Sequence, residues 1–133
     1  MNVSTYAAPV KFAQRPANER YYGVDIAEDG ALVVAARPAG RAAPVARYPA
    51  GAAGVTALSK QIGLESAHSH VCIRSRGAVA LSLSMALIAL PGAEVTLVAA
   101  HAIERTVPGV NAVKANQPEE RAQRLAQLAE RMF

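Results

Sequence analysis

An aspartate at the centre of an apolar β-hairpin is the feature that most constrains this chain. In the segment 21–37, YYGVDIAEDGALVVAAR, Asp25 stands between two β-branched residues, which favour a strand. Residues 28–30, Glu-Asp-Gly, predict a tight turn, and residues 32–34 predict a second strand. A carboxylate buried without a partner is costly. Asp25 therefore needs a metal ion, a cationic side chain or a set of hydrogen-bond donors.

The size and charge of the chain limit what it can be. Its 133 residues suit one domain, and a hydrophobic fraction of 52% is ample for one core. The formal net charge of +4 is compatible with a nucleic-acid or other anionic partner, but an ordinary basic protein has the same charge. Cys72 is the only cysteine, so no intramolecular disulfide forms, and its apolar neighbours predict a small buried side chain.

No stretch of the sequence has the pattern of a membrane segment. The longest apolar run, 78–90, is interrupted by two serines and stops at Pro91, so it is too short to span a bilayer. Residues 1–20 lack the continuous apolar core of a secretory signal. We therefore expect a cytoplasmic protein with no membrane partner, in which a flexible arm over residues 1–20 precedes a single domain over residues 21–133.

Hydrophobic periodicity predicts five strands and three main helices. The expected strands are Tyr21–Ala27, Ala31–Arg37, Val45–Tyr48, His70–Ile73 and Glu94–Ala99, and the expected helices are Gly54–Ile62, Ala78–Leu90 and Pro118–Met132. A short helix is expected at 101–105 and a loop at 107–115. Because the later strands alternate with helices, they should run parallel to the first strand.

The order β-β-β-α-β-α-β-α predicts an α/β fold with a five-stranded mixed sheet of the ribonuclease H-like plan, flanked by helices. The strand Tyr21–Ala27 is expected at the centre, with 71–73 beside it and parallel to it. The helix 78–90 is apolar nearly all round, so we expect it to be well buried.

The last helix has a clear start and an apolar stripe. Asn116-Gln117-Pro118-Glu119 is typical of a helix start, with Asn116 as the cap and Glu119 three residues later. The stripe comprises Ala122, Leu125, Ala129 and Met132, and the arginines at 121, 124 and 131 are expected on other faces of the helix. This helix should place its stripe on the sheet.

Three segments together resemble the N-terminal, RuvC-like domain of the DEDD transposases, a family that includes the pilin-gene inverting recombinase. Residues 22–27, YGVDIA, resemble the family's opening strand. Residues 71–90 followed by 93–103 resemble its fourth strand, glycine turn, helix and fifth strand. Residues 114–119, KANQPE, resemble the closing lysine-threonine-aspartate motif. The resemblance extends over residues 21–133 and implies a ribonuclease H-like fold.

The resemblance also implies that the family's chemistry is lost. The family uses four carboxylates to hold two divalent metal ions, which prefer oxygen ligands. Only the first carboxylate has a counterpart, Asp25; the second position falls on Arg74, the third on Asn116 and the fourth near Glu119. An arginine at a ligand position repels a metal ion. We therefore expect no catalytic residues, no metal and no cofactor.

Local explanations compete with these site assignments. Asp25 can be a satisfied core acid, and Asn116 with Glu119 can be a capping box. His68 and His70, at His-Ser-His spacing, would lie on one side of a strand as metal ligands, but no third ligand is visible nearby.

Three functions fit these observations. The first is a non-catalytic, transposase-derived domain that binds DNA or RNA or has a regulatory role, with Arg74, Arg76, Arg105 and Lys114 forming a basic surface at the site end. The second is a protein-interaction domain of the same fold, similar to actin-like assembly proteins, although residues 27–29 replace their phosphate-binding turn. The third and least supported is a residual metal-dependent nuclease. The sequence is compatible with a protein partner and with a homo-oligomer.

The position of Arg74 also predicts the partner of Asp25. Both residues are expected at the same end of neighbouring parallel strands. A guanidinium fits a carboxylate well, because its planar fork can donate two hydrogen bonds. We therefore expect a direct Asp25–Arg74 pair, and a loss of about 3 kcal/mol on replacing Arg74 by alanine.

Overall fold

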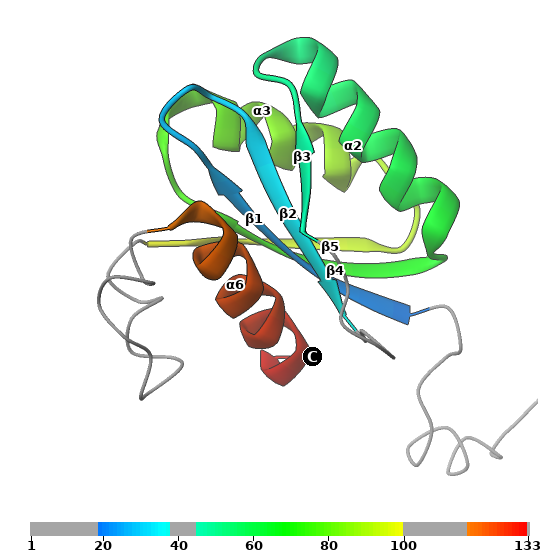
Figure 1. Ribbon diagram of the computed structural model, residues 1–133. Helices are drawn as coiled ribbons and strands as arrows, with labels where there is room; N and C mark the ends of the chain where they lie inside the picture. The colour runs from blue at the N-terminus through cyan, green and yellow to red at the C-terminus, as the bar shows by residue number, and fades with distance from the viewer. Residues whose placement is uncertain (1–18, 38–44, 100–116, 133) are drawn as a thin grey trace, which may run out of the picture.

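The computed structural model describes residues 19–37, 45–99 and 117–132. Within them, five strands form one mixed sheet in the order β3-β2-β1-β4-β5 (Figure 1). The strands are β1 (Glu19–Ile26), β2 (Leu32–Arg37), β3 (Ala46–Tyr48), β4 (His68–Arg74) and β5 (Ala93–Val98). The expectations for residues 1–18, for the short helix at 101–105 and for the loop at 107–115 lie outside the described residues.

The pairing of the strands confirms the predicted mixed sheet. Strands β1, β2 and β3 pair antiparallel, whereas β4 pairs parallel with both β1 and β5. Tyr22 is opposite Val71 and Val24 is opposite Ile73, as expected. Strand β1 begins at Glu19, two residues before the predicted start, so Glu19 and Arg20 belong to the sheet and not to an arm.

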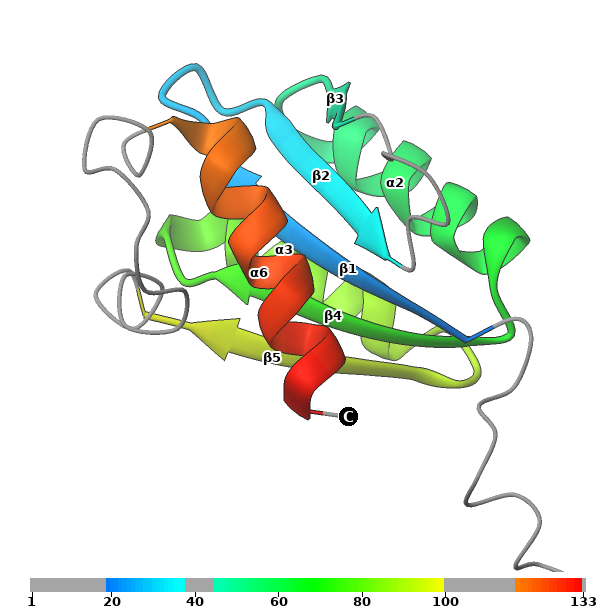
Figure 2. The same cartoon turned by 60° about the horizontal axis from the view of Figure 1, so that its bottom comes forward.

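Three helices cover the two faces of the sheet. Helices α2 (Ala52–Glu65) and α3 (Gly77–Ile88) lie on one face, and α6 (Pro118–Met132) lies across the other (Figures 1 and 2). The chain is therefore a three-layer α/β structure over the described residues. None of the described helices has both the length and the apolar character needed to cross a bilayer.

Strand β1 contributes side chains to the cores on both faces of the sheet, because successive side chains of a strand point to opposite faces. Tyr22, Val24 and Ile26 belong to the core between the sheet and helices α2 and α3. Tyr21 lies on the opposite face, in a cluster that includes Leu125 of α6. The alternation also directs Gly23 and Asp25 toward α6, since both are an even number of residues from Tyr21.

Gly23 allows α6 to lie close to the sheet. A Cβ atom added to Gly23 would collide with the backbone of Ala122 and Ala126 and would lie 2.7 Å from the Cβ of Leu125. Only a residue without a side chain fits this contact. Gly23 therefore determines how near the first half of α6 comes to β1.

Helix α3 differs from its expected burial. Ala80, Leu83 and Leu87 face the sheet and are buried, but Leu81, Met85 and Ile88 are 57%, 67% and 64% exposed. The sequence is apolar all round, which predicts full burial, but α3 has only the sheet and α2 beside it within the described residues. One flank of α3 consequently remains on the surface.

Cys72 confirms its predicted role as a small buried hydrophobe. Its side chain is fully buried between β4 and α6, in the cluster with Tyr21, Val98 and Leu125. Burial raises the pKa of the Cys72 thiol to about 11. The thiol is therefore held in its protonated form at neutral pH.

Candidate functional site

The candidate site lies where β1, β4 and α6 meet. Asp25 is one residue before the end of β1, and Arg74 is the last residue of β4. The two strands are parallel, so their carboxyl ends lie at the same edge of the sheet. Helix α6 begins at this edge, and its fourth residue is Arg121.

Two guanidinium groups share the carboxylate of Asp25. Arg74 Nη1 donates to Oδ1 at 3.3 Å, and Arg121 Nε donates to Oδ2 at 2.9 Å. The Asp25 side chain is 0% exposed, whereas Arg74 and Arg121 are 20% and 16% exposed. The expected Asp25–Arg74 pair is confirmed, and the structure adds a second cation with the shorter contact. Each carboxylate oxygen thus has an arginine donor.

Arg76 extends the positive surface beyond this ion-pair cluster. It is the N-cap residue of α3, is exposed to solvent, and donates from Nη1 to the backbone oxygen of Ile26 at 3.0 Å. With Arg74 and Arg121 it brings three positive charges around the single negative charge of Asp25. We call these four residues the Asp25 cluster; among them positive charge exceeds negative charge by two.

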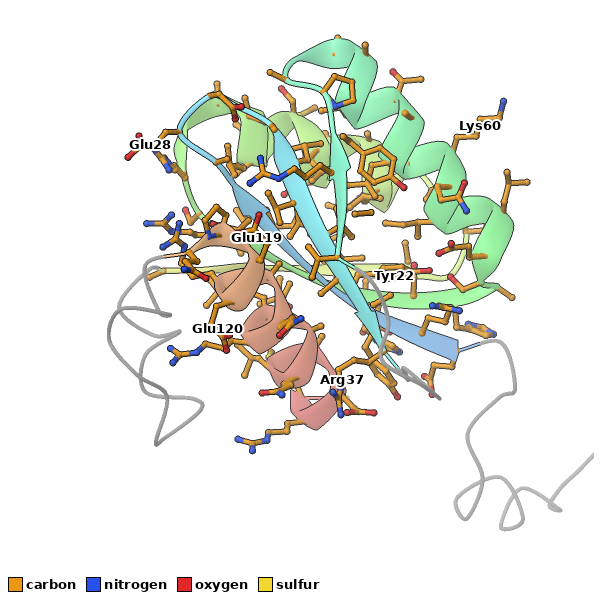
Figure 3. The ribbon with its side chains drawn as sticks, viewed as in Figure 1. Tyr22, Glu28, Arg37, Lys60, Glu119 and Glu120 are labelled. Carbon is orange, nitrogen blue, oxygen red and sulfur yellow. The ribbon has the colours of Figure 1, made fainter. Side chains whose placement is uncertain are left out.

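Two acidic residues, Glu28 and Asp29, lie in the turn that follows β1. Asp29 stabilises the turn after β1, where its Oδ1 accepts a hydrogen bond from the Ala31 amide at 3.0 Å and Gly30 has φ of 89°. This confirms the predicted turn. Glu28 in the same turn is exposed (Figure 3).

Glu119, near the start of α6, forms an ion pair with a residue of β3. Arg47 Nη2 of β3 donates to Glu119 Oε2 at 2.7 Å, and this hydrogen bond holds the pKa of the Glu119 carboxyl below its ordinary value. In the first turn of α6, the Arg121 amide donates to the Gln117 oxygen at 3.1 Å. The predicted capping box pairs Glu119 with Asn116, which lies outside the described residues, so it stays a prediction.

His68 and His70 are not brought together as metal ligands. His70 is buried at the opposite end of β4, stacks on Tyr21, and its Nε2 lies 2.8 Å from Glu19 Oε2. Its other ring nitrogen, Nδ1, faces Glu94 at 3.7 Å, so the two carboxylates lie on different sides of the ring. Among the residues that the structure describes, no group of three or more histidine, cysteine or acidic side chains is arranged to hold a metal ion.

The prediction that Arg121 and Arg124 lie on faces of α6 away from the sheet is wrong. Arg121 reaches Asp25, and Arg124 is 3% exposed, with its Nε 3.9 Å from Glu120 Oε2. A usable signal was present for Arg121, because it precedes Leu125 by four residues and so shares the face of α6 that packs on the sheet. Of the basic residues predicted to form the binding surface, Arg74 and Arg76 lie together, whereas Arg105 and Lys114 are outside the described residues.

Comparison with known proteins does not assign this chain to a family. No protein-family model matches it, and no curated protein has a significantly similar sequence.

Proposed function

We propose that this chain is a non-catalytic ribonuclease H-like domain that binds nucleic acid through the Asp25 cluster. The observation that carries the proposal is that arginines occupy both oxygens of the Asp25 carboxylate. The site therefore presents guanidinium groups to a partner, with the carboxylate behind them. The strand order β3-β2-β1-β4-β5 with helices on both faces supports the ribonuclease H-like plan.

Phosphate is the partner chemistry that this surface fits best. Guanidinium groups bind phosphate oxygens through charge-assisted hydrogen bonds, and arginine presents five donors in a rigid plane. Arg76 is the most exposed member of the Asp25 cluster, and Arg74 and Arg121 are partly exposed. Because such contacts go to the phosphate backbone, we expect binding that depends on salt and little on base sequence.

Binding is tested by reversing charge at Arg76 and at Lys114, which the sequence predicts to belong to the same basic surface. In fluorescence anisotropy with short DNA and RNA duplexes, Arg76→Glu combined with Lys114→Glu is expected to weaken binding at least tenfold and to flatten the dependence of log K on log salt by about two. Lys60→Glu is a control for charge, since Lys60 projects from α2, away from Glu119 at the start of α6 (Figure 3). Unchanged affinity and slope in the double variant would contradict the proposal.

The alternative function is a protein-interaction domain of the same fold, of the actin-like assembly type. The observation that favours it is the exposed apolar flank of α3, formed by Leu81, Met85 and Ile88. The protein-interaction function would be favoured if the protein bound neither DNA nor RNA at low salt.

We also expect no cleavage of DNA or RNA with Mg²⁺ or Mn²⁺. To ligate a metal ion, Asp25 would have to exchange its contacts with Arg74 and Arg121, whose positive charges repel the ion. Incubation of the purified protein with supercoiled plasmid and labelled RNA, with either metal or with chelator, measures this. Metal-dependent nicking that disappears in Asp25→Asn would show the residual nuclease to be the correct function.

A further inference from the structure

We infer that two copies of this chain associate edge to edge, through β5 and the exposed flank of α3. The inference is independent of the proposed function, because these residues lie outside the Asp25 cluster. It rests on three features of one edge of the molecule: outward backbone groups, a neighbouring apolar strip and the absence of charge along most of its length.

Among the described strands β5 ends the sheet, and the backbone groups along its outer side have no partner in the part of the chain that the structure describes. The Ser69 amide donates to the Gly92 oxygen and the Ser75 amide donates to the Val98 oxygen, so even-numbered residues from 92 to 98 turn their backbone groups toward β4. In a parallel pair the alternate residues face away. The amides and carbonyls of Val95 and Leu97 therefore point out from the sheet, where a further strand would bind.

The apolar flank of α3 lies above this same edge. Helix α3 packs over β5 and β4, whereas α2 lies on its other side and reaches β3. With about 100° between successive residues of a helix, Leu81, Met85 and Ile88 share a sector of about 60°. That sector is turned away both from the buried face and from Val79, which lines a hollow with Val55 of α2. It therefore faces the β5 edge.

Leu97 continues the strip from the helix to the sheet. Val95 packs into the core on the α2 and α3 side, and Leu97 is two residues further along, so it faces the same way. Leu97 is 44% exposed. We call Leu81, Met85, Ile88 and Leu97 the edge strip.

Within residues 19–37, 45–99 and 117–132, the β5 edge has few of the features that prevent strands from pairing. Natural edge strands are kept apart by short length, lysine, proline or bulges. The opposite edge strand, β3, follows this rule: it has three residues, carries Arg47 and is followed by Pro49. Strand β5 has six residues, AEVTLV, with Glu94 as its only charge, and α3 has no charged residue at all.

A second copy of the chain can pair with this edge without bringing like charges together. Two β5 strands related by a two-fold axis at Val95 or Thr96 run antiparallel, which places Glu94 opposite Thr96 or Val98 of the other copy and not opposite a second Glu94. The two α3 helices then meet across the same axis through uncharged faces. Two chains that each have a net charge of +4 can thus associate without facing like charges at the contact.

The size of the edge predicts a weak dimer. Strand β5 is about 20 Å long and α3 about 18 Å long, so the edge offers on the order of 500 Å² per copy, less than the ~800 Å² per partner of a standard stable interface. We therefore expect a concentration-dependent dimer with a dissociation constant on the order of 10–100 µM.

Sedimentation equilibrium of nucleic-acid-free protein from about 1 to 500 µM tests the inference. The wild type is expected to shift from monomer to dimer over this range. Met85→Lys, at the centre of the edge strip, is expected to weaken the dimer at least tenfold. Leu97→Pro removes an outward amide while leaving the pairing with β4 intact, and is expected to have the same effect. Circular dichroism establishes that both variants remain folded.

Leu64→Lys is the matched control, because Leu64 is 73% exposed on α2 and lies outside the edge strip. It is expected to leave the dissociation constant unchanged. A wild type that stays monomeric at the highest concentration overturns the inference, as does a dimer that Leu64→Lys weakens as much as Met85→Lys. Slow hydrogen exchange of the Val95 and Leu97 amides in dilute, monomeric protein would show that another segment of the chain covers the edge, and would overturn it too.

Discussion

Replacing both Arg74 and Arg121 by alanine is expected to destabilise the fold by about 4 kcal/mol, while either single replacement costs about 1–1.5 kcal/mol. The reason is that each arginine binds a different oxygen of the fully buried Asp25 carboxylate. After one replacement the other guanidinium still compensates the charge. After both, Asp25 is left buried without either of these cations.

This changes the expectation for Arg74→Ala drawn from the sequence. A loss of about 3 kcal/mol assumed that Arg74 was the only cation beside Asp25. Because Arg121 makes the shorter contact, 2.9 Å against 3.3 Å, Arg121→Ala is expected to be the more costly single variant.

Denaturant unfolding of the wild type, the two single variants and the double variant measures the coupling. The loss in the double variant should exceed the sum of the single losses by about 1–2 kcal/mol. Adding Asp25→Asn to the double variant should recover part of the stability, since the unpaired charge is removed. Strictly additive losses would contradict the view that each arginine compensates the Asp25 charge when the other is removed.

Gly23→Ala is expected to destabilise the fold by about 3 kcal/mol, because the added methyl group has no room beneath α6. It would meet the backbone of Ala122 and Ala126, and backbone cannot move aside as a flexible side chain can. Helix α6 would have to lift from β1, which also weakens the contact between Arg121 and Asp25.

The same substitution in α2 is the control. A Cβ on Gly63 would lie 3.5 Å from the nearest atom, Leu90 Cδ2, which is an ordinary contact. Gly63→Ala should therefore stabilise the protein by about 0.5–1 kcal/mol, since alanine favours a helix over glycine. Urea unfolding of both variants with a common m-value measures the difference. Equal effects at the two positions would show that α6 does not press on Gly23.

The order of strands and helices was predictable because it depends on short-range patterns. Alternating β-branched residues around Asp25, the Asp29-Gly30 turn and the later alternation of strands with helices led to the observed mixed sheet with β1 at its centre. The Asp25–Arg74 pair was predictable for a related reason. Once two parallel strands are neighbours, the residues near their carboxyl ends must lie at one edge of the sheet.

The rotation of each helix about its own axis, which decides the side chains that face the sheet, was not predictable in the same way. Arg121 is 96 residues from Asp25 in the chain, and its contact with Asp25 depends on how α6 is rotated and how closely Gly23 lets it approach. Helix α3 shows the converse, since a helix that is apolar all round does not reveal which flank will remain without a neighbour.

The sequence by itself determined the α/β class, the centre of the sheet and the need of Asp25 for a partner. Local periodicity and the cost of an unpaired buried charge are sufficient for these conclusions. Only the tertiary structure decided that two arginines share Asp25, that Glu119 pairs with Arg47, and that α3 leaves an apolar flank beside β5. Each of these depends on the placement of one element against another, which long-range packing determines and local pattern does not.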